Sequence, residues 1–198
     1  WQRYAVMSAE KLEVIMGDAP LAAHLGPLGG TGLTAYFGLF RVGRPVPGDT
    51  VLVSGAAGAT GSIVGQLAKL AGCRVVGIAG GAEKCAWLVN ELGFDEAIDY
   101  KNDRVKAAIR AACSAGVNVF FDNVGGTILN DALACIALNA RVVICGGISR
   151  YEQAVLPAGP ANYFNLVFKR STMSGFLVTD YASEFPAARA RLADWLQQ

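Results

Sequence analysis

A short glycine-rich segment is the clearest candidate for chemistry in this 198-residue sequence. It runs from Ser54 to Gly61 and reads Ser-Gly-Ala-Ala-Gly-Ala-Thr-Gly. A turn of this kind lets the backbone approach a pyrophosphate closely, and it opens a helix whose first amides point at the anion. Gly58 and Gly61 occupy the second and third glycine positions of the dinucleotide fingerprint, whereas Ala56 replaces the first. The segment follows the apolar run Val51–Val53 and precedes a helical stretch, which is the context that the motif requires.

The end of the next apolar run indicates which dinucleotide would bind. NAD-binding sites carry an acidic residue about twenty residues past the glycines, where it accepts a hydrogen bond from the ribose 2′-hydroxyl. Here the run ends in Gly80 and Gly81, and no acid stands at that point. Lys84 follows at the start of a predicted helix, where it can meet a 2′-phosphate for which the two glycines leave room. The residues favour NADP(H) over NAD(H), and the other interpretation of Lys84 is a solvated surface lysine.

The composition argues against several other function classes. The 17 basic and 16 acidic residues give a net charge of +1, which provides no field for a nucleic acid or an anionic membrane. The five cysteines are widely spaced and never form a C-x-x-C pair, so neither a disulfide framework nor a zinc knuckle is indicated. A zinc or serine hydrolase would depend on the one histidine, His24. We expect no metal site, no nucleic-acid or membrane partner, and reduced thiols in a cytoplasmic protein.

Strand-like and helical stretches alternate from about residue 48 onward. The alternation is typical of βαβ units, and near-continuous Val and Ile runs indicate strands that are buried on both faces. We therefore predict an α/β fold, a Rossmann-like, doubly wound parallel sheet. Gly93 and Gly116 stand where helix C-caps are expected, and Asn102 or Asp103 where an N-cap is expected. The predicted strands are Thr50–Ser54, Arg74–Ala79, Glu96–Asp99, Val117–Asp122, Arg141–Cys145 and Thr172–Leu177, and the predicted helices are Gly61–Leu70, Ala82–Leu92, Asp103–Cys113, Thr127–Leu138 and a last one from Ala182 toward Gln198.

Residues 1–47 lack this alternation. Within them, Trp1–Val6 is predicted as a strand and Thr31–Val42 as a helix that leads into the sheet. We expect residues 1–47 to be a connector and residues 48–198 to be a nucleotide-binding domain. Because the chain opens on Trp1, it is expected to be an excised segment.

Several motifs in order resemble those of the medium-chain dehydrogenase/reductase superfamily, and the resemblance extends over essentially the whole chain. The group that it resembles most comprises zinc-independent prostaglandin reductases, leukotriene B4 dehydrogenases and 2-alkenal or curcumin reductases. The motifs are Leu33-Thr34-Ala35-Tyr36-Phe37-Gly38, the segment Val53–Gly61, Ala79-Gly80-Gly81-Ala82-Glu83-Lys84-Cys85, Ile98-Asp99-Tyr100-Lys101, Phe121-Asp122-Asn123-Val124-Gly125-Gly126 and Cys145-Gly146-Gly147-Ile148-Ser149.

The resemblance implies NADPH-dependent reduction of the C=C bond of α,β-unsaturated ketones and aldehydes, such as 15-oxo-prostaglandins or alkenals. It also implies a separate GroES-like catalytic domain, of which residues 1–47 would carry the end, and a homodimer formed through the sheet edge at Thr172–Leu177. Two alternatives remain open. One is an NADPH quinone oxidoreductase of the same superfamily, and the other is a non-catalytic protein that binds NADPH as a redox sensor or for structure.

The resemblance further implies roles for single residues. Tyr151 is the candidate catalytic residue and would lie near the cofactor or the substrate; the alternative is a surface aromatic. Cys145 has a packed core thiol as its alternative. Hydride transfer to the β-carbon of an enone would leave an enolate, which solvent or a tyrosine protonates. The implied contacts are Ala57, Gly58, Ala59, Thr60 and Gly61 for the pyrophosphate, Gly80, Lys84 and Tyr100 for the 2′-phosphate, and Asn123, Cys145, Gly146, Ile148, Tyr151, Phe176, Leu177 and Val178 for the ribose, nicotinamide or substrate.

Overall fold

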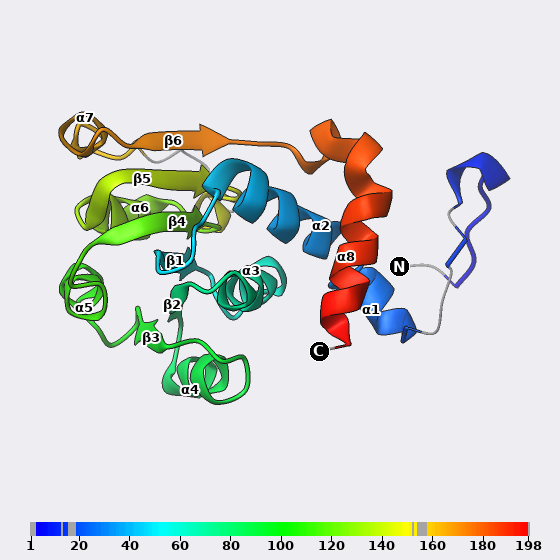
Figure 1. Ribbon diagram of the computed structural model, residues 1–198, viewed down its shortest axis with the longest axis horizontal. Helices are drawn as coiled ribbons and strands as arrows, with labels where there is room; N and C mark the ends of the chain where they lie inside the picture. Colours follow the sequence, from blue (N-terminus) through cyan, green and yellow to red (C-terminus); the bar gives the residue numbers. More distant parts are fainter. Residues whose placement is uncertain (1–2, 13, 16–18, 152, 154–157, 198) are drawn as a thin grey trace.

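Six parallel strands form the sheet around which the chain is organised (Figure 1). The computed structural model describes residues 3–12, 14–15, 19–151, 153 and 158–197. The strand order is β3-β2-β1-β4-β5-β6, which is the order of a doubly wound dinucleotide-binding sheet. The predicted Rossmann-like α/β fold is therefore confirmed. The strands are β1 (Thr50–Ser54), β2 (Arg74–Ala79), β3 (Glu96–Asp99), β4 (Val117–Asp122), β5 (Ile136–Ile144) and β6 (Thr172–Gly175).

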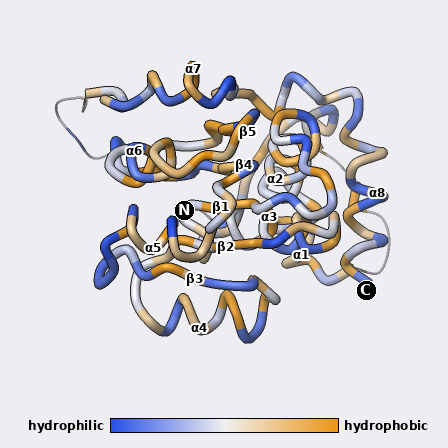
Figure 2. The backbone as a smooth tube through the Cα atoms, turned by 60° about the vertical axis from the view of Figure 1, so that its left-hand side comes forward, coloured by the Kyte–Doolittle hydropathy of each residue, from blue (hydrophilic) through white to orange (hydrophobic). Residues whose placement is uncertain are grey.

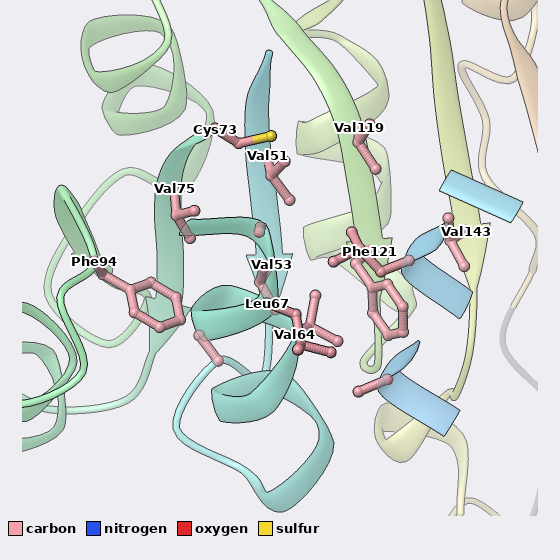
Figure 3. Close-up of a cluster of buried hydrophobic side chains, with 14 of the residues drawn as sticks. Val51, Val53, Val64, Leu67, Cys73, Val75, Phe94, Val119, Phe121 and Val143 are labelled. Atoms are coloured by element: carbon pink, nitrogen blue, oxygen red, sulfur yellow. The ribbon is translucent and has the colours of Figure 1, made fainter. Parts of the chain in front are cut away.

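Helices cover both faces of the sheet, so alternate side chains of each strand are buried in different layers. Val51, Val53 and Phe121 point into one layer, where they pack with α3 (Figure 3). Leu52 and Phe120 point into the other layer, which α5 and α6 cover. Figure 2 shows hydrophobic residues along the central strands, as expected for strands that are buried on both sides. The α-helices are α1 (Leu21–Leu25), α2 (Gly30–Phe37), α3 (Ala59–Leu70), α4 (Ala82–Asn90), α5 (Val105–Ala112), α6 (Gly126–Leu133), α7 (Asn165–Lys169) and α8 (Phe185–Leu196).

The part of the chain just before β1, from Leu28 to Leu39, contributes to the packed core. The predicted helix Thr31–Val42 is present as α2 followed by the π-helical segment η2 (Gly38–Gly43). Leu33 is 1% exposed, and Phe37 is fully buried. The Phe37 ring stacks on Tyr181 of the 3₁₀ helix η4 (Val178–Glu184), with ring centroids 4.6 Å apart. Residues near the two ends of the described chain therefore close one face of the sheet together.

Some of the predicted element boundaries are wrong, and strand pairing explains the largest difference. The helix predicted to reach Leu138 ends at Leu133, and β5 begins at Ile136 instead of Arg141. The Val117 amide donates to the carbonyl of Cys135, and Val117 then pairs with Ile136. Pairing with β4 therefore overrides the helical pattern of residues 134–138.

Side-chain hydrogen bonds account for a second correction. The helix predicted from Asp103 begins at Val105, with Arg104 at its N-cap. The Asp103 carboxylate instead accepts from the backbone amide of Asp99, at 2.8 Å, and Asn102 also bonds to Asp99. Neither Asn102 nor Asp103 is therefore the N-cap, contrary to the prediction. The helix C-caps are Glu91 and Cys113 rather than the predicted Gly93 and Gly116, which follow in the next turns with φ of 70° and 89° that favour glycine.

The remaining differences concern the ends of elements. The predicted helices 61–70 and 82–92 are α3, which begins at Ala59, and α4, which ends at Asn90. The last helix begins at Phe185, after η4, and β6 ends at Gly175 rather than at Leu177. Residues 3–6 form no strand, because no described segment pairs with them, and residues 1–2 lie outside the described part. Two further 3₁₀ helices are η1 (Ala9–Lys11) and η3 (Ile148–Arg150). None of the helices in the described ranges has the length and apolar character needed to cross a membrane.

Candidate functional site

A cavity of about 700 Å³ opens at the carboxyl edge of the sheet. The loops that follow β1, β2, β3 and β4 line it, together with the segment after β5. Ligands of doubly wound sheets bind at this edge, where the strand order reverses, and here the reversal lies between β1 and β4. We call this cavity the cleft. Its lining residues are Gly55, Ala57, Gly58, Ala59, Thr60, Gly61, Ala79, Gly80, Lys84, Tyr100, Val105, Asn123, Val124, Gly125, Thr127, Ile128, Ile148 and Ser149.

A cavity of similar size, about 650 Å³, lies beside α1 and α8, and its lining is mainly apolar. It contains none of the predicted site residues. The cleft at the sheet edge is therefore the better candidate for a functional site.

The glycine loop forms the cleft wall at the start of α3. Gly55 has φ of 58°, a conformation that glycine adopts without strain. A Cβ atom on Gly61 would lie 2.4 Å from the carbonyl oxygen of Gly55, so only glycine lets the helix start this close to the turn. Helix α3 begins at Ala59 with Gly58 as its N-cap. The first amides of a helix have no acceptor within the helix, and they favour an anion together with the helix dipole. The loop fits a pyrophosphate.

Lys84 and Tyr100 lie on the same cleft from two neighbouring loops. Lys84 is in the first turn of α4, and its side chain is exposed. Tyr100 follows β3, and its backbone amide donates to the carbonyl of Ala79 at 3.0 Å. A Cβ atom on Gly80 would lie 2.8 to 2.9 Å from atoms of the Tyr100 ring, so the glycine makes room for the phenol. A cation and a hydroxyl donor on one wall of the cleft fit a phosphate group.

A buried carboxylate holds the base of the cleft between β1 and β4. Asp122 is fully buried and accepts hydrogen bonds from the Ser54 hydroxyl, at 2.6 Å, and from the amides of Val124 and Gly125, at 3.0 Å. The Asn123 side-chain amide donates to the carbonyl of Ser54 at 2.7 Å, and its backbone amide donates to the Ser54 hydroxyl at 2.9 Å. The network fixes Asn123 at the point where the strand order reverses.

The structure brings ten of the predicted contacts together on the cleft: Ala57, Gly58, Ala59, Thr60, Gly61, Gly80, Lys84, Tyr100, Asn123 and Ile148. Six other predicted residues do not line the cleft: Cys145, Gly146, Tyr151, Phe176, Leu177 and Val178. Cys145 packs against the core, and burial, with a smaller contribution from Asp122, raises the pKa of its thiol to about 11. Phe176 and Val178 also pack against the core, whereas Leu177 is exposed.

Tyr151 lies close to the cleft without being part of it. Its hydroxyl accepts from the amide of Gly147 at 3.4 Å, next to Ile148 of the cleft wall. The side chain is nevertheless 72% exposed. Its catalytic role stays a prediction.

Sequence reasoning missed part of the wall contributed by the β4–α6 loop. Gly125 and Gly126 have φ of 74° and 59°, and the loop also brings Val124 to the cleft. The Ser149 hydroxyl donates to the carbonyl of Val124 at 2.6 Å and joins this loop to the segment after β5. The consecutive glycines were the signal for a tight turn into a helix, yet no role had been assigned to them. The cleft residues to which no role had been assigned are Gly55, Ala79, Val105, Val124, Gly125, Thr127, Ile128 and Ser149.

The described residues do not fit a zinc ion. Zinc sites in proteins use three or four His, Cys, Asp or Glu ligands. Within the described ranges, no group of three such side chains is placed to share a metal. The cysteines at positions 73, 85, 113, 135 and 145 are free thiols that form no disulfide.

The known proteins to which this chain is similar are dehydrogenases and reductases. The family model for zinc-binding dehydrogenases matches residues 59–194. The NADPH-dependent curcumin reductase of Escherichia coli is 37% identical over 205 residues, and prostaglandin reductase 1 of Bos taurus is 42% identical over 205 residues. Each alignment covers 100% of this chain, which spans 59% and 62% of the length of these two relatives. The crystal structure of CurA from Vibrio vulnificus in complex with NADPH matches with a TM-score of 0.85 and 40% identity, covering 92% of this chain and 56% of that one.

Proposed function

Because the chain belongs to the zinc-binding dehydrogenase family, within the medium-chain dehydrogenase/reductase superfamily, we propose that it binds NADP(H) for a zinc-independent reductase of enones and enals. The observation that carries the proposal is that two possible phosphate sites line the same cleft. The first is the glycine loop at the start of α3, and the second is the pair Lys84 and Tyr100. The first site suits a pyrophosphate and the second suits a 2′-phosphate. A relative that binds NADPH, CurA of Vibrio vulnificus, has the same fold over 92% of this chain.

Each part of the cleft has its own role in the proposed binding mode. Amides at the start of α3 donate to the pyrophosphate oxygens, because they have no acceptor within the helix. Lys84 supplies charge and Tyr100 a hydroxyl donor to the 2′-phosphate. Asn123 is held by Ser54 at the β1 and β4 ends and orients the ribose side of the ligand.

Bound NADPH would supply the hydride that adds to the β-carbon of the substrate alkene. The electron pair of the C=C bond then moves toward the carbonyl oxygen, and a proton added at the α-carbon completes the saturated product. This chain's own residues orient the ligand at the edge of the cleft and hold the loop after β5 beside it. Tyr151, whose hydroxyl is exposed next to that loop, is our candidate for delivering the proton.

The named relatives support an α,β-unsaturated carbonyl as the substrate class. Curcumin is an unsaturated diketone, and the second relative is a prostaglandin reductase. Because the chain spans about 60% of their length, residues outside it would complete the substrate pocket. Within the class, we propose 15-oxo-prostaglandins or alkenals as substrates.

A substrate panel tests the proposed reaction. The full-length protein that carries this chain would be assayed with NADPH against an alkenal, an enone and a quinone, with loss of absorbance at 340 nm as the signal. We expect turnover of the alkenal and the enone. Faster turnover of the quinone would point to a quinone oxidoreductase instead. Tight NADPH binding without turnover of any of the three compounds would point to a sensor.

A lysine substitution tests the proposed cofactor. Because Lys84 is exposed, Lys84→Ala should weaken NADPH binding by about 1.5 kcal/mol, or roughly tenfold in Kd, near the low end for a charged hydrogen bond. Binding of NADH, which has no 2′-phosphate, should not change. Lys106→Ala is the matched control, because Lys106 is an exposed helix lysine that does not line the cleft. Equal losses for both nucleotides in Lys84→Ala would exclude the 2′-phosphate role.

We also propose a cytoplasmic homodimer. The edge strand β6 is exposed along its whole length, and a free edge of this kind can pair with a second strand. Exposed apolar side chains, Phe168 and Leu177 among them, lie on either side of β6 in the sequence. The free thiols are compatible with a reducing compartment.

A further inference from the structure

Asp99 joins the two loops that present Lys84 and Tyr100, although Asp99 itself does not line the cleft. It is the last residue of β3 and pairs with Ala79, the last residue of β2. Its side chain turns inward, because the residue is only 9% exposed. The proposed mechanism gives this carboxylate no role.

Every oxygen of the Asp99 side chain is used in holding backbone or side-chain donors. Oδ1 accepts from the amide of Gly81 at 2.7 Å and from the amide of Lys101 at 3.0 Å. Oδ2 accepts from the Asn102 side-chain amide at 2.6 Å. These hydrogen bonds, the Gly81 amide first, hold the pKa of Asp99 below its ordinary value. The carboxylate therefore stays charged near neutral pH and works as a fixed acceptor.

The bond to Gly81 controls where helix α4 starts. Gly81 is the N-cap of α4 and has φ of 100°, and its amide, which precedes the helix, donates to Asp99. Lys84 follows three residues later, in the first turn. A displacement of Gly81 would move the lysine relative to the glycine loop.

The bond to Lys101 controls the other loop. The amides of Tyr100 and Lys101 are held by the Ala79 carbonyl and by Asp99, respectively. With its backbone fixed on both sides, Tyr100 places its ring against Gly80 and its hydroxyl at the cleft. A single carboxylate thus bonds to both loops, the one that carries the cation and the one that carries the phenol.

We propose that Asp99 is a positioning residue that sets the preference for NADP(H) over NAD(H), by fixing the β2–α4 and β3–α5 loops in one arrangement. The role rests on the proposed function, because it concerns the 2′-phosphate that distinguishes the two nucleotides. Asp99 is an acid near a dianion, yet its oxygens are occupied by donors and it is buried. It orders the lysine and the phenol without itself facing the phosphate.

The test compares dissociation constants for NADPH and NADH in the full-length protein, measured by calorimetry, with Asp99→Asn as the main variant. Asparagine keeps one oxygen acceptor but has no charge. Its NH2 group would face the NH2 group of Asn102, and the hydrogen bond between these two side chains would be lost. We expect the Kd for NADPH to rise on the order of tenfold, while the Kd for NADH stays within about twofold.

Asp95→Asn is the matched control. Asp95 lies just before β3, at the amino ends of the strands and therefore at the other end of β3 from the cleft. There its carboxylate accepts from the amide of Val75 at 2.7 Å and forms an ion pair with Lys69. Its substitution should lower the melting temperature but leave the ratio of the two dissociation constants unchanged. Asn102→Ala is a milder second variant, which removes one donor to Asp99. It should shift the ratio in the same direction by about threefold, and it decides the question if Asp99→Asn does not fold.

The outcomes separate this role from the proposed cofactor. If the wild type binds the two nucleotides equally, the proposed cofactor is wrong, and the role of Asp99 is wrong with it. If the wild type prefers NADPH but the variants weaken both nucleotides alike, or neither of them, only the role of Asp99 is overturned. A selective loss of NADPH in Asp99→Asn and Asn102→Ala, without one in Asp95→Asn, supports it.

Discussion

Burial decides the chemistry of the cysteine next to the candidate site. Cys145 ends its run of apolar residues against the core, and desolvation raises the pKa of its thiol to about 11. Cys113 is buried on the other face of the sheet, and desolvation raises the pKa of that thiol to about 12. Since the thiolate is the nucleophile, neither residue is expected to react readily near neutral pH.

Alkylation with iodoacetamide measures this directly. At pH 8 about one Cys145 side chain in a thousand is a thiolate, so labelling should be slow and should accelerate about tenfold per pH unit up to about pH 11. Cys85 and Cys145 are both partly buried, but the large rise in the pKa of Cys145 should make Cys85 the faster of the two, and Cys85 should also be labelled before the buried Cys113. Peptide mass spectrometry at pH 7, 8 and 9 follows each site separately. Rapid labelling of Cys145 at pH 7 would contradict its burial.

At the scale of residues, the sequence predicted those parts of the site that depend on backbone space or on an exposed charge. The role of Gly61 could be predicted because a helix that starts this close to a strand excludes a Cβ atom. The role of Lys84 could be predicted because no acidic residue stands at the end of the preceding strand. Asp99 and Asp122 were not predicted as site residues. Each of the two carboxylates holds a loop of the site by accepting hydrogen bonds from backbone amides. The sequence does not show which amides these are, because the folding of the sheet brings them together.

At the scale of elements, α3 lies close to the sheet because it carries a glycine where it meets Phe94. A Cβ atom on Gly65 would lie 1.9 Å from the ring of Phe94, and Phe94 is only 2% exposed. The helix that offers its first turn to the cleft is therefore positioned by a contact one turn further along.

Gly65→Ala should lower the free energy of unfolding by about 1–3 kcal/mol, because the helix and the ring must separate. Urea denaturation measures the loss. Gly30→Ala is the control, since a Cβ atom at this position of α2 has no atom within 4 Å, and it should change stability by less than about 0.5 kcal/mol. The double variant Gly65→Ala with Phe94→Leu should recover part of the loss. An additive double variant would show that the ring is not the obstacle.

The sequence was a good guide to elements whose apolar pattern is continuous and a poor one where tertiary pairing chooses between alternatives. Every predicted strand of the sheet exists, and the Val- and Ile-rich runs of the buried strands β1, β2 and β5 are the ones that predict a strand most directly. The residues Ile136–Leu138 fit a helix equally well, and only the position of β4 makes them a strand. In the same way, Asp103 is a good N-cap residue whose carboxylate is taken by the Asp99 amide.

At the scale of the whole molecule, the exposed edge at β6 predicts self-association. Met173→Lys combined with Leu177→Lys places two charges at this edge, and charges on an edge strand oppose pairing with another chain. We expect analytical ultracentrifugation to show a dimer for the full-length protein and a monomer for the double variant at equal concentration. Val46→Lys, an exposed apolar residue in the loop before β1, should leave the dimer intact. A wild-type monomer at micromolar concentration would refute the proposed dimer.

The stacking of Phe37 on Tyr181 also has a consequence for synthesis on the ribosome. Helix α2 is translated before the sheet, whereas η4 and α8, which cover the same face of the sheet, are translated after it. The nascent chain therefore carries an apolar face, formed by residues such as Leu33 and Phe37, throughout the synthesis of the sheet. Exposed surface of this kind is what chaperones recognise and what aggregates when it meets a second copy. This face of the sheet is covered only after η4 and α8 have been translated.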